Sequence, residues 1–160
     1  MFVAVFPPPS AVEPLRACLP AGAKLTRPSK WHVTLVFLGE APADEVSAAL
    51  DEVPVSGSFA LRLAGGGRFG TAAWAAVGGD LAALRNLRED VRNALTAAGF
   101  RSADRPYQPH LTVTYRGDRA VREALAGYAG DSWTVTEFAL VDSDDGEYGT
   151  LRAWPLEQGG

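Results

Sequence analysis

The chain has 160 residues, a length typical of one domain, and its 47% hydrophobic and 21% charged residues are values of a globular protein. No apolar stretch reaches the roughly 18 residues that a membrane span requires, and the N-terminal segment lacks the basic region of a signal peptide. The single cysteine, Cys18, excludes an internal disulfide and a cysteine-based zinc cluster. These features predict a soluble, cytoplasmic protein.

Charge is distributed unevenly along the chain. The formal net charge of −4 argues against a surface that coats nucleic acid. However, no acid occurs between Glu13 and Glu40, and a second, mostly basic stretch spans residues 101–116. The basic residues of the two stretches are Arg16, Lys24, Arg27, Lys30, Arg101, Arg105 and Arg116. Since each stretch precedes or spans a histidine, the sequence is compatible with a local anion-binding site.

The first third of the chain predicts two strands and two helices. An apolar run at 2–6, ended by three prolines, is typical of a strand. Ser10 followed by Glu13 has the pattern of a capping box and predicts a short helix. Residues 33–38 are apolar enough for a buried strand, and a helix with one apolar face is expected over 42–53.

The middle of the chain predicts a hairpin followed by the longest helix. Residues 59–63 and 72–77 have the composition of strands around a glycine-rich turn. The G-x-G-x-x-G pattern at 65–70 matches a dinucleotide-binding fingerprint, but that motif requires a helix after it, and here a strand pattern follows. We therefore interpret the glycines as a turn. Asp80 is the expected cap of the long helix, and Gly99 its end.

The last third predicts three strands and one helix. Strands are expected at 111–115, 133–141 and 148–155, with a helix capped by Asp118 after the first of them. Because no low-complexity linker divides the chain, we expect a single domain over residues 1–160.

Two segments of the chain repeat one pattern. In residues 32–40 and 110–118, a histidine, a threonine, an aromatic residue, a glycine and an acid recur at the same offsets, and an amphipathic helix follows each. The two copies lie 78 residues apart, about half of the chain. Such self-similarity predicts two lobes, each built from one half of the chain and related by a pseudo-two-fold axis. The matching strands, with motifs at 32–35 and 110–113, are expected to face each other across a groove.

The repeated motif carries groups suited to acid–base chemistry. Because side chains alternate along a strand, His32 shares a face with Thr34, and His110 with Thr112. Two imidazoles beside one phosphodiester can act together, one taking a proton from the nucleophile and the other giving a proton to the leaving oxygen. The threonine hydroxyls can donate hydrogen bonds to the non-bridging oxygens. A lone histidine is more often a packing residue, but the duplicated context favours catalysis, and a zinc site lacks a third His or Cys ligand.

With these motifs the sequence resembles the 2H phosphoesterases, and within them the RNA 2′,3′-cyclic phosphodiesterases, also called 2′-5′ RNA ligases. The similarity rests first on the two H-x-T motifs and extends along nearly the whole chain. The segments that carry it are 2–8, 27–40, 105–110, 148–151 and 154–156.

The resemblance implies an α+β fold with two lobes, in which two antiparallel sheets with flanking helices surround a central cleft. It implies metal-independent hydrolysis of RNA 2′,3′-cyclic phosphate ends to a 2′-phosphate, with reversible 2′-5′ ligation as a further activity. His32 is then the proton donor and His110 the proton acceptor. The expected substrates are RNA ends or nucleoside 2′,3′-cyclic phosphates. We expect no cofactor, no metal, no membrane association and no obligate protein partner, and a monomer.

The resemblance also bears on phosphate binding, which we expect from Thr34, Thr112 and an arginine. Members of the family commonly carry an arginine five residues after the second histidine, where it contacts phosphate. That position is Tyr115 here, and Arg116 comes one residue later. On a regular strand Arg116 lies on the face of His110, so we expect it to take this role.

Aromatic residues near the motifs are candidates for stacking on a nucleobase, although each is also a candidate for simple packing. They are Trp31, Phe37, Tyr107 and Tyr115. Two alternative functions stay open: a non-catalytic module that binds RNA ends or nucleotides, and a 2H phosphodiesterase that acts on another small cyclic nucleotide. The intact pair of histidines favours an enzyme.

Overall fold

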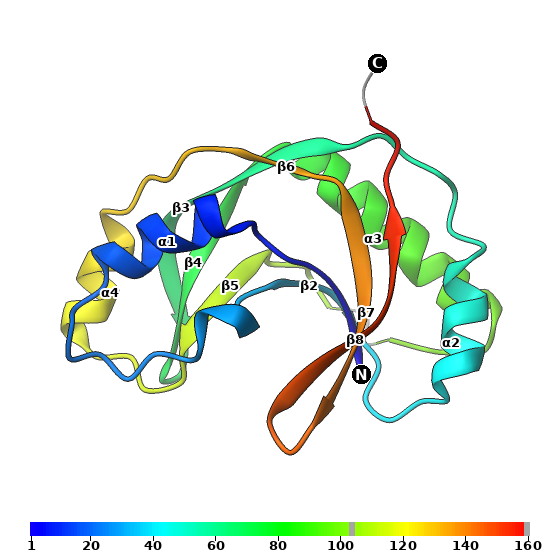
Figure 1. The fold of residues 1–160 in the computed structure, drawn as a ribbon, viewed down its shortest axis with the longest axis horizontal. Coiled ribbons are helices and arrows are strands. Elements are labelled where there is room, and N and C mark those ends of the chain that lie inside the picture. Colours follow the sequence, from blue (N-terminus) through cyan, green and yellow to red (C-terminus); the bar gives the residue numbers. More distant parts are fainter. Residues whose placement is uncertain (103–104, 159–160) are drawn as a thin grey trace.

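Two antiparallel sheets of four strands each form the framework of the computed structural model, which describes residues 1–102 and 105–158 (Figure 1). The strands in this part are β1 (Phe2–Val5), β2 (Val33–Phe37), β3 (Phe59–Phe69), β4 (Ala72–Gly79), β5 (His110–Thr114), β6 (Trp133–Val135), β7 (Glu137–Asp144) and β8 (Glu147–Pro155). The helices are α1 (Pro9–Cys18), α2 (Ala43–Leu50), α3 (Leu81–Ala97) and α4 (Arg119–Ala126), with a 3-10 turn η1 (Pro28–Lys30).

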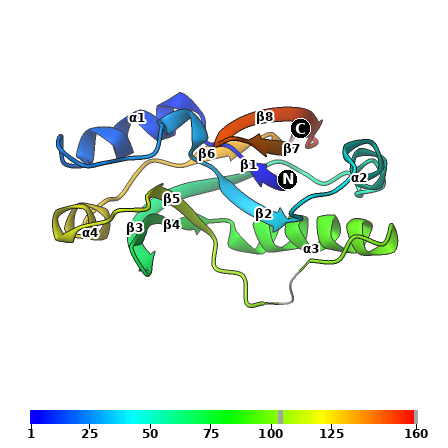
Figure 2. The same cartoon turned by 90° about the horizontal axis from the view of Figure 1, so that it is seen from below.

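The strand orders are β2-β1-β7-β8 in one sheet and β5-β4-β3-β6 in the other. Helices α1 and α4 lie at one end of the molecule, and α2 and α3 lie at the other (Figures 1 and 2). None of the helices in the described residues is long and apolar enough to cross a membrane.

These orders agree with the expected pseudo-two-fold relation but correct what each lobe contains. The series β1-α1-β2-α2-β3 matches the series β4-α3-β5-α4-β7. In each series the first two strands pair with each other, and the last strand joins the other sheet. In the second series β6 lies between α4 and β7 and stays in the sheet of β4 and β5. The prediction that each half of the sequence forms its own lobe is therefore wrong. Because the halves exchange strands, the two sheets are locked together, and the motif strands β2 and β5 occupy equivalent edges.

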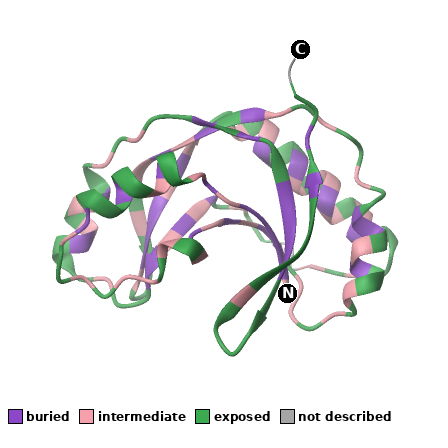
Figure 3. Cartoon of the chain, in the orientation of Figure 1, coloured by how far each residue is buried: buried purple, intermediate pink, exposed green. Residues whose placement is uncertain are grey.

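The larger of two hydrophobic clusters in the described residues joins the strands to the four helices, and buried residues are frequent along the strands (Figure 3). The apolar stripe of α3 supplies four residues of this core: Leu84, Leu87, Val91 and Leu95. The expected caps are confirmed, because Asp80 accepts a hydrogen bond from the Ala83 N–H at 3.0 Å and Asp118 accepts one from the Val121 N–H at 2.9 Å. Each cap pairs an N–H that the helix itself leaves without a partner.

The capping box predicted at Ser10 is wrong. Helix α1 begins at Pro9, with Pro8 as its N-cap, so Ser10 already lies within the helix. Pro9 suits the first position of a helix because proline has no backbone N–H that would need a hydrogen-bond partner there. Glu13 instead pairs with Arg16 at 2.9 Å on the exposed surface.

The glycine-rich segment is strand rather than turn. β3 continues through the glycines to Phe69, and the hairpin turns at Gly70, whose φ is +60°. The glycines are required by close packing, because a Cβ on Gly67 would lie 2.3 Å from the ring of Trp74. A Cβ on Gly66 would lie 2.5 Å from the Cβ of Leu125 in α4.

The single strand predicted over 133–141 is two strands in different sheets. β6 pairs with β3, whereas β7 pairs with β1. Thr136 separates them, and its carbonyl accepts a hydrogen bond from the N–H of Leu156 at 2.8 Å. The chain thus crosses between sheets within one residue, which an apolar run does not reveal.

Candidate active site

The two motif strands bring their histidines and threonines into one pocket. β2 and β5 are edge strands of different sheets, and they lie next to each other (Figure 2). His32, Thr34, His110 and Thr112 line a cavity of 410 Å³ between them. The other lining residues are Thr26, Lys30, Tyr115, Ser143, Gly146 and Tyr148. The four motif residues predicted from the sequence therefore share a single site.

Each imidazole is oriented by a backbone carbonyl two residues before it. His32 Nδ1 lies 2.7 Å from the carbonyl oxygen of Lys30, and His110 Nδ1 lies 2.7 Å from that of Gln108. A carbonyl only accepts hydrogen bonds, so in both rings Nδ1 carries the proton and donates. The tautomer follows from these partners, and Nε2 is left as the nitrogen that exchanges a proton. His32 Nε2 also lies 3.0 Å from the Thr34 hydroxyl oxygen.

Aromatic rings hold both histidines, and the sequence reasoning missed all of them. The His32 ring stacks on Phe2 with centroids 4.6 Å apart and meets Tyr148 edge-on at 5.6 Å. The His110 ring meets Phe69 edge-on at 5.0 Å and Trp74 at 5.5 Å. Burial lowers the pKa of His32 below its ordinary value, the hydrogen bond to Lys30 opposes this shift, and the nearby His110 lowers the pKa further.

This lowered pKa predicts that His32 makes the stability of the protein depend on pH. The unfolded chain protonates His32 near pH 6.5, before the folded chain does, so the unfolded state binds more protons in that window. The contribution of His32 to the free energy of unfolding is therefore fully present above about pH 6.5, and it is lost as the pH falls through the lower pKa of the folded state. We expect the free energy of urea unfolding to decrease between pH 7 and pH 5, and to decrease less in His32→Gln. An equal decrease in both proteins would contradict the shift.

A β-bulge interrupts each motif strand at the same motif position. In β2, Ala4 faces Thr34 and Val3 faces Val36, so Leu35 is the extra residue. In β5, Trp74 faces Thr112 and Ala73 faces Thr114, which makes Val113 the extra residue. A bulge shifts the alternation of side chains by one. Residues after it consequently face the opposite way from those on a regular strand.

The bulge corrects the placement expected for Arg116. With the alternation shifted at Val113, Thr114 is fully buried, Tyr115 lines the pocket, and Arg116 is exposed beyond the end of β5. The backbone N–H of Arg116 donates to the Thr114 hydroxyl at 3.0 Å. Arg116 is thus outside the lining of the pocket, and its expected contact with phosphate has no support from this geometry.

Lys30 brings a positive charge to the pocket that the sequence reasoning did not assign. Among the described residues that line this pocket, it is the only Lys or Arg. Its Nζ donates to the carbonyl of Gly146 and lies 5.2 Å from the ring centroid of Tyr148. A signal existed in the sequence, since Lys30 lies two residues before His32 in the acid-free stretch.

The aromatic candidates fall into different environments. Trp31 is 1% exposed and donates from Nε1 to the Thr26 hydroxyl at 3.0 Å, so it is a core residue. Phe37 is 67% exposed and Tyr115 is 62% exposed. Tyr107 is partly buried, and its hydroxyl donates to the carbonyl of Thr34 at 2.7 Å. Phe37 and Tyr115 are therefore free to contact a ligand, whereas Tyr107 is engaged within the protein.

A second cavity, of 500 Å³, adjoins the first and shares Thr34 and His110 with it. Its lining combines exposed aromatic surface with arginines. The residues that carry this character are Phe37, Phe69, Arg88, Arg101, Arg105 and Tyr107. In the described residues no three His, Cys, Asp or Glu side chains gather as a metal site would require. The two cavities together suit an anion with an aromatic base.

Comparison with known proteins identifies one family. The family model described as the 2′-5′ RNA ligase superfamily matches residues 6–147. A protein from Thermus thermophilus named RNA 2′,3′-cyclic phosphodiesterase is 34% identical over 166 residues, covering 90% of this chain and 81% of the relative. A Geobacillus stearothermophilus protein of the same name is 32% identical over 143 residues, or 79% of this chain. The chain spans about half the length of two curated relatives, 45% of the Geobacillus protein and 55% of one from Aeropyrum pernix.

Solved structures extend the similarity to three dimensions. The crystal structure of E. coli LigT in apo form superposes with a TM-score of 0.78 at 26% identity, covering 98% of this chain and 96% of that chain. E. coli LigT complexed with 3′-AMP superposes with a TM-score of 0.69 at 25% identity, covering 97% and 96% of the two chains.

Proposed function

Because the chain belongs to the 2′-5′ RNA ligase superfamily, we propose that it hydrolyses the 2′,3′-cyclic phosphate at RNA ends to a 2′-phosphate, with His32 and His110 as its acid and base. The observation that carries this proposal is the shared pocket, in which both imidazoles are fixed through Nδ1 and keep Nε2 for proton transfer. The names of the relatives and the 3′-AMP complex of E. coli LigT support the choice of substrate.

The proposed reaction is an in-line displacement at phosphorus. His110 Nε2 takes a proton from water as the water oxygen bonds to phosphorus, and the bond from phosphorus to the 3′ oxygen breaks. His32 enters this step protonated on both ring nitrogens, and its Nε2 gives a proton to that 3′ oxygen, which leaves as a hydroxyl. The hydroxyls of Thr34 and Thr112 donate to the non-bridging oxygens, where negative charge increases. When the 5′-hydroxyl of a second RNA replaces water, the same steps form a 2′-5′ linkage.

The second cavity is the proposed site for the nucleoside and the adjoining RNA. Phe37 offers an exposed ring there, and Tyr115 offers one in the phosphate pocket, so both are proposed to stack on a base. Arg101 and Arg105 line the same cavity and can contact the next phosphates. Because these cations are few and the net charge is −4, we propose that the protein binds an RNA end rather than a long duplex.

The test is turnover of an oligoribonucleotide that ends in a 2′,3′-cyclic phosphate, measured in parallel with and without EDTA. We expect a single product with a terminal 2′-phosphate, identified by phosphorus NMR, and the same rate without EDTA. Binding without turnover would favour the non-catalytic module. Turnover confined to another cyclic nucleotide would favour the second alternative, and an EDTA-sensitive rate that zinc restores would contradict the metal-independent mechanism.

Lys30 is proposed to supply the cation that contacts the phosphate in place of Arg116. A hydrogen bond to a charged group contributes about 1.5–3 kcal/mol, so Lys30→Met is expected to lower kcat/KM about 10- to 100-fold. Lys30→Arg should retain most of the activity. The kinetics of a mononucleoside 2′,3′-cyclic phosphate give the measurement, since that substrate lacks further phosphates.

Two matched controls separate this role from others. Arg27 pairs with Glu147 on the same hairpin that Lys30 contacts, but Arg27 does not line the pocket. Arg27→Met therefore tests whether tethering the hairpin is what matters, and a small effect is expected. A larger loss in Arg116→Ala than in Lys30→Met would assign the phosphate contact to Arg116 after all.

A further inference from the structure

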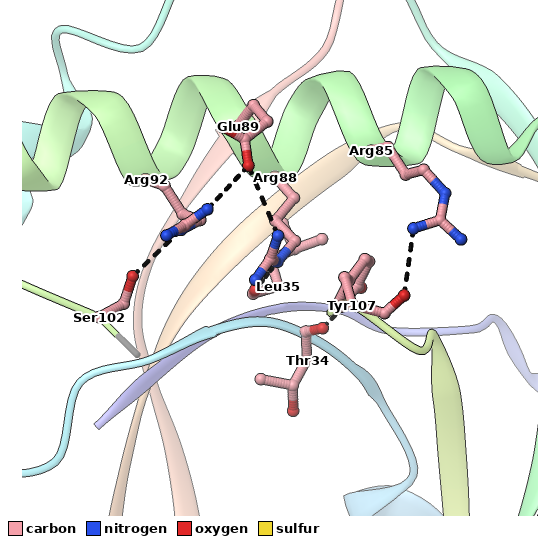
Figure 4. Close-up of polar contacts among 8 residues, drawn as sticks. All are labelled: Thr34, Leu35, Arg85, Arg88, Glu89, Arg92, Ser102 and Tyr107. Carbon is pink, nitrogen blue, oxygen red and sulfur yellow. Dashed lines mark hydrogen bonds and ion pairs between the residues drawn. The ribbon is translucent and has the colours of Figure 1, made fainter. Parts of the chain in front are cut away.

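Side-chain donors bond to the carbonyls of β2 beside the catalytic threonine. The hydroxyl of Tyr107 donates to the carbonyl of Thr34 at 2.7 Å, and Arg88 Nε donates to the carbonyl of Leu35 at 3.2 Å (Figure 4). Leu35 is the bulge residue, which lacks a partner residue on β1. Tyr107 and Arg88 therefore bond β2 at the point where the bulge interrupts its pairing.

β5 in turn receives hydrogen bonds at its own bulge. The carbonyl of Val113, the bulge residue of β5, accepts from the Thr26 N–H at 2.8 Å and from the Thr26 hydroxyl at 3.1 Å. Thr26 lies in the segment that leads to His32, and Tyr107 lies in the segment that leads to His110. The segment before each histidine thus bonds to the motif strand that carries the other histidine.

We propose that Thr26 and Tyr107 form a reciprocal clasp that sets the spacing of His32 and His110, and that Tyr107 is a positioning residue for the reaction. This inference rests on the proposed function, because spacing matters only if the two imidazoles act on one phosphate. β2 and β5 belong to different sheets, so no strand ladder joins them directly. The clasp supplies hydrogen bonds that connect the two motifs across that boundary.

Tyr107 is itself held firmly by α3. The guanidinium of Arg88 lies 4.4 Å from the centroid of the Tyr107 ring, and Arg85 donates to the Tyr107 carbonyl at 3.1 Å (Figure 4). Glu89 lies 3.5 Å from Arg88 and so restrains it. Burial raises the pKa of the Tyr107 hydroxyl, which keeps it protonated and able to donate. The helix therefore fixes Tyr107, and Tyr107 fixes β2.

Small displacements at such a site have large effects on rate. A misplacement of about 1 Å can lower the rate about 100-fold, because both proton transfers require aligned atoms. Tyr107→Phe removes the hydroxyl and keeps the ring against Arg88. We expect kcat for a mononucleoside 2′,3′-cyclic phosphate to fall about 10- to 100-fold, with KM changed less than about threefold. The melting temperature should remain close to that of the unmodified protein.

Tyr128→Phe is the matched control, since Tyr128 follows α4 and lies outside both cavities. Thr26→Val and Thr26→Ser give a second test on the other half of the clasp. The valine variant loses the hydroxyl bond to Val113 and the hydroxyl that accepts from Trp31 Nε1, but it keeps the backbone bond to Val113. Its loss of kcat should therefore be smaller, and serine, which keeps the hydroxyl, should restore it. A kcat for Tyr107→Phe within twofold of the unmodified protein, or a change in KM alone, would overturn the clasp.

An NMR measurement separates failure of the clasp from failure of the proposed function. Ring resonances of both histidines are recorded in the unmodified protein, in Tyr107→Phe and in Tyr128→Phe, all without substrate. We expect Tyr107→Phe alone to shift the resonances of His32 and to change its titration midpoint. If the resonances respond but no variant turns over the cyclic phosphate, the proposed function is wrong and the clasp stands. Unchanged resonances and midpoint in Tyr107→Phe would overturn the clasp whatever the activity.

Discussion

Replacing either His32 or His110 with alanine is expected to lower kcat about 10²- to 10⁴-fold, the loss typical of removing one acid–base catalyst. Neither replacement should unfold the protein, because the core is formed by the neighbouring residues on the opposite face, Val33 and Leu111, which are fully buried. Turnover of an RNA 2′,3′-cyclic phosphate end and the melting temperature, measured on the same preparations, test both statements.

The double variant distinguishes a concerted pair from two independent groups. If His32 and His110 act on one phosphate, the loss in the double variant should be far smaller than the product of the two single losses. Affinity for the 2′-phosphate product should change little in the single variants, since the threonines and Lys30 remain in the pocket. Near-full activity in either single variant would show that the paired-histidine mechanism is wrong.

The duplicated motif made the assembly of this site predictable from the sequence. Four side chains at two fixed offsets were enough to expect His32, Thr34, His110 and Thr112 in one groove, and the structure brings them together. Helix N-termini were also predictable where an acidic side chain accepts a hydrogen bond from a backbone N–H of the first turn, as at Asp80 and Asp118. These features depend on local spacing, which a sequence displays directly.

Features that depend on contacts distant in sequence were not predictable in this way. The bulge at Val113 arises where β5 pairs with β4, and nothing in the alternation of residues 110–116 reveals it. Its consequence is large, because Tyr115 lines the pocket, whereas a regular strand would place Arg116 there. The same limit explains the glycine segment: Gly67 is small because Trp74 lies against it, and that contact exists only in the folded hairpin.

The crossing of β3 and β7 between sheets also depends on contacts between residues distant in sequence. Self-similarity over half of the chain correctly predicted a pseudo-two-fold relation. It could not show that β3 joins the sheet of β4 and β5, or that β7 and β8 join the sheet of β1 and β2. The exchange of strands also allows the clasp to connect the two motifs. Thr26 and Tyr107 precede different histidines, yet each bonds to the opposite motif strand because the two sheets are interlocked.

The symmetry of the site leaves the direction of proton transfer to be established by a leaving-group experiment. In the proposed mechanism His32 protonates the 3′ oxygen, whose alkoxide is a poor leaving group. A substrate analogue with sulfur as the 3′ bridging atom releases a thiolate, and a thiol with a pKa of about 8.5 leaves without needing a proton. General acid catalysis should then become unnecessary, whereas activation of water should not.

The analogue is therefore expected to rescue one histidine variant and not the other. With the sulfur substrate, His32→Ala should turn over within about tenfold of the unmodified protein, although it loses about 10²- to 10⁴-fold with the oxygen substrate. His110→Ala should lose a similar factor with both substrates, because the nucleophile is still water. Measuring kcat for the two substrates and three proteins gives the comparison. Rescue of His110→Ala instead would reverse the two roles, and rescue of neither would show that protonation of the leaving oxygen is not what the lost imidazole supplies.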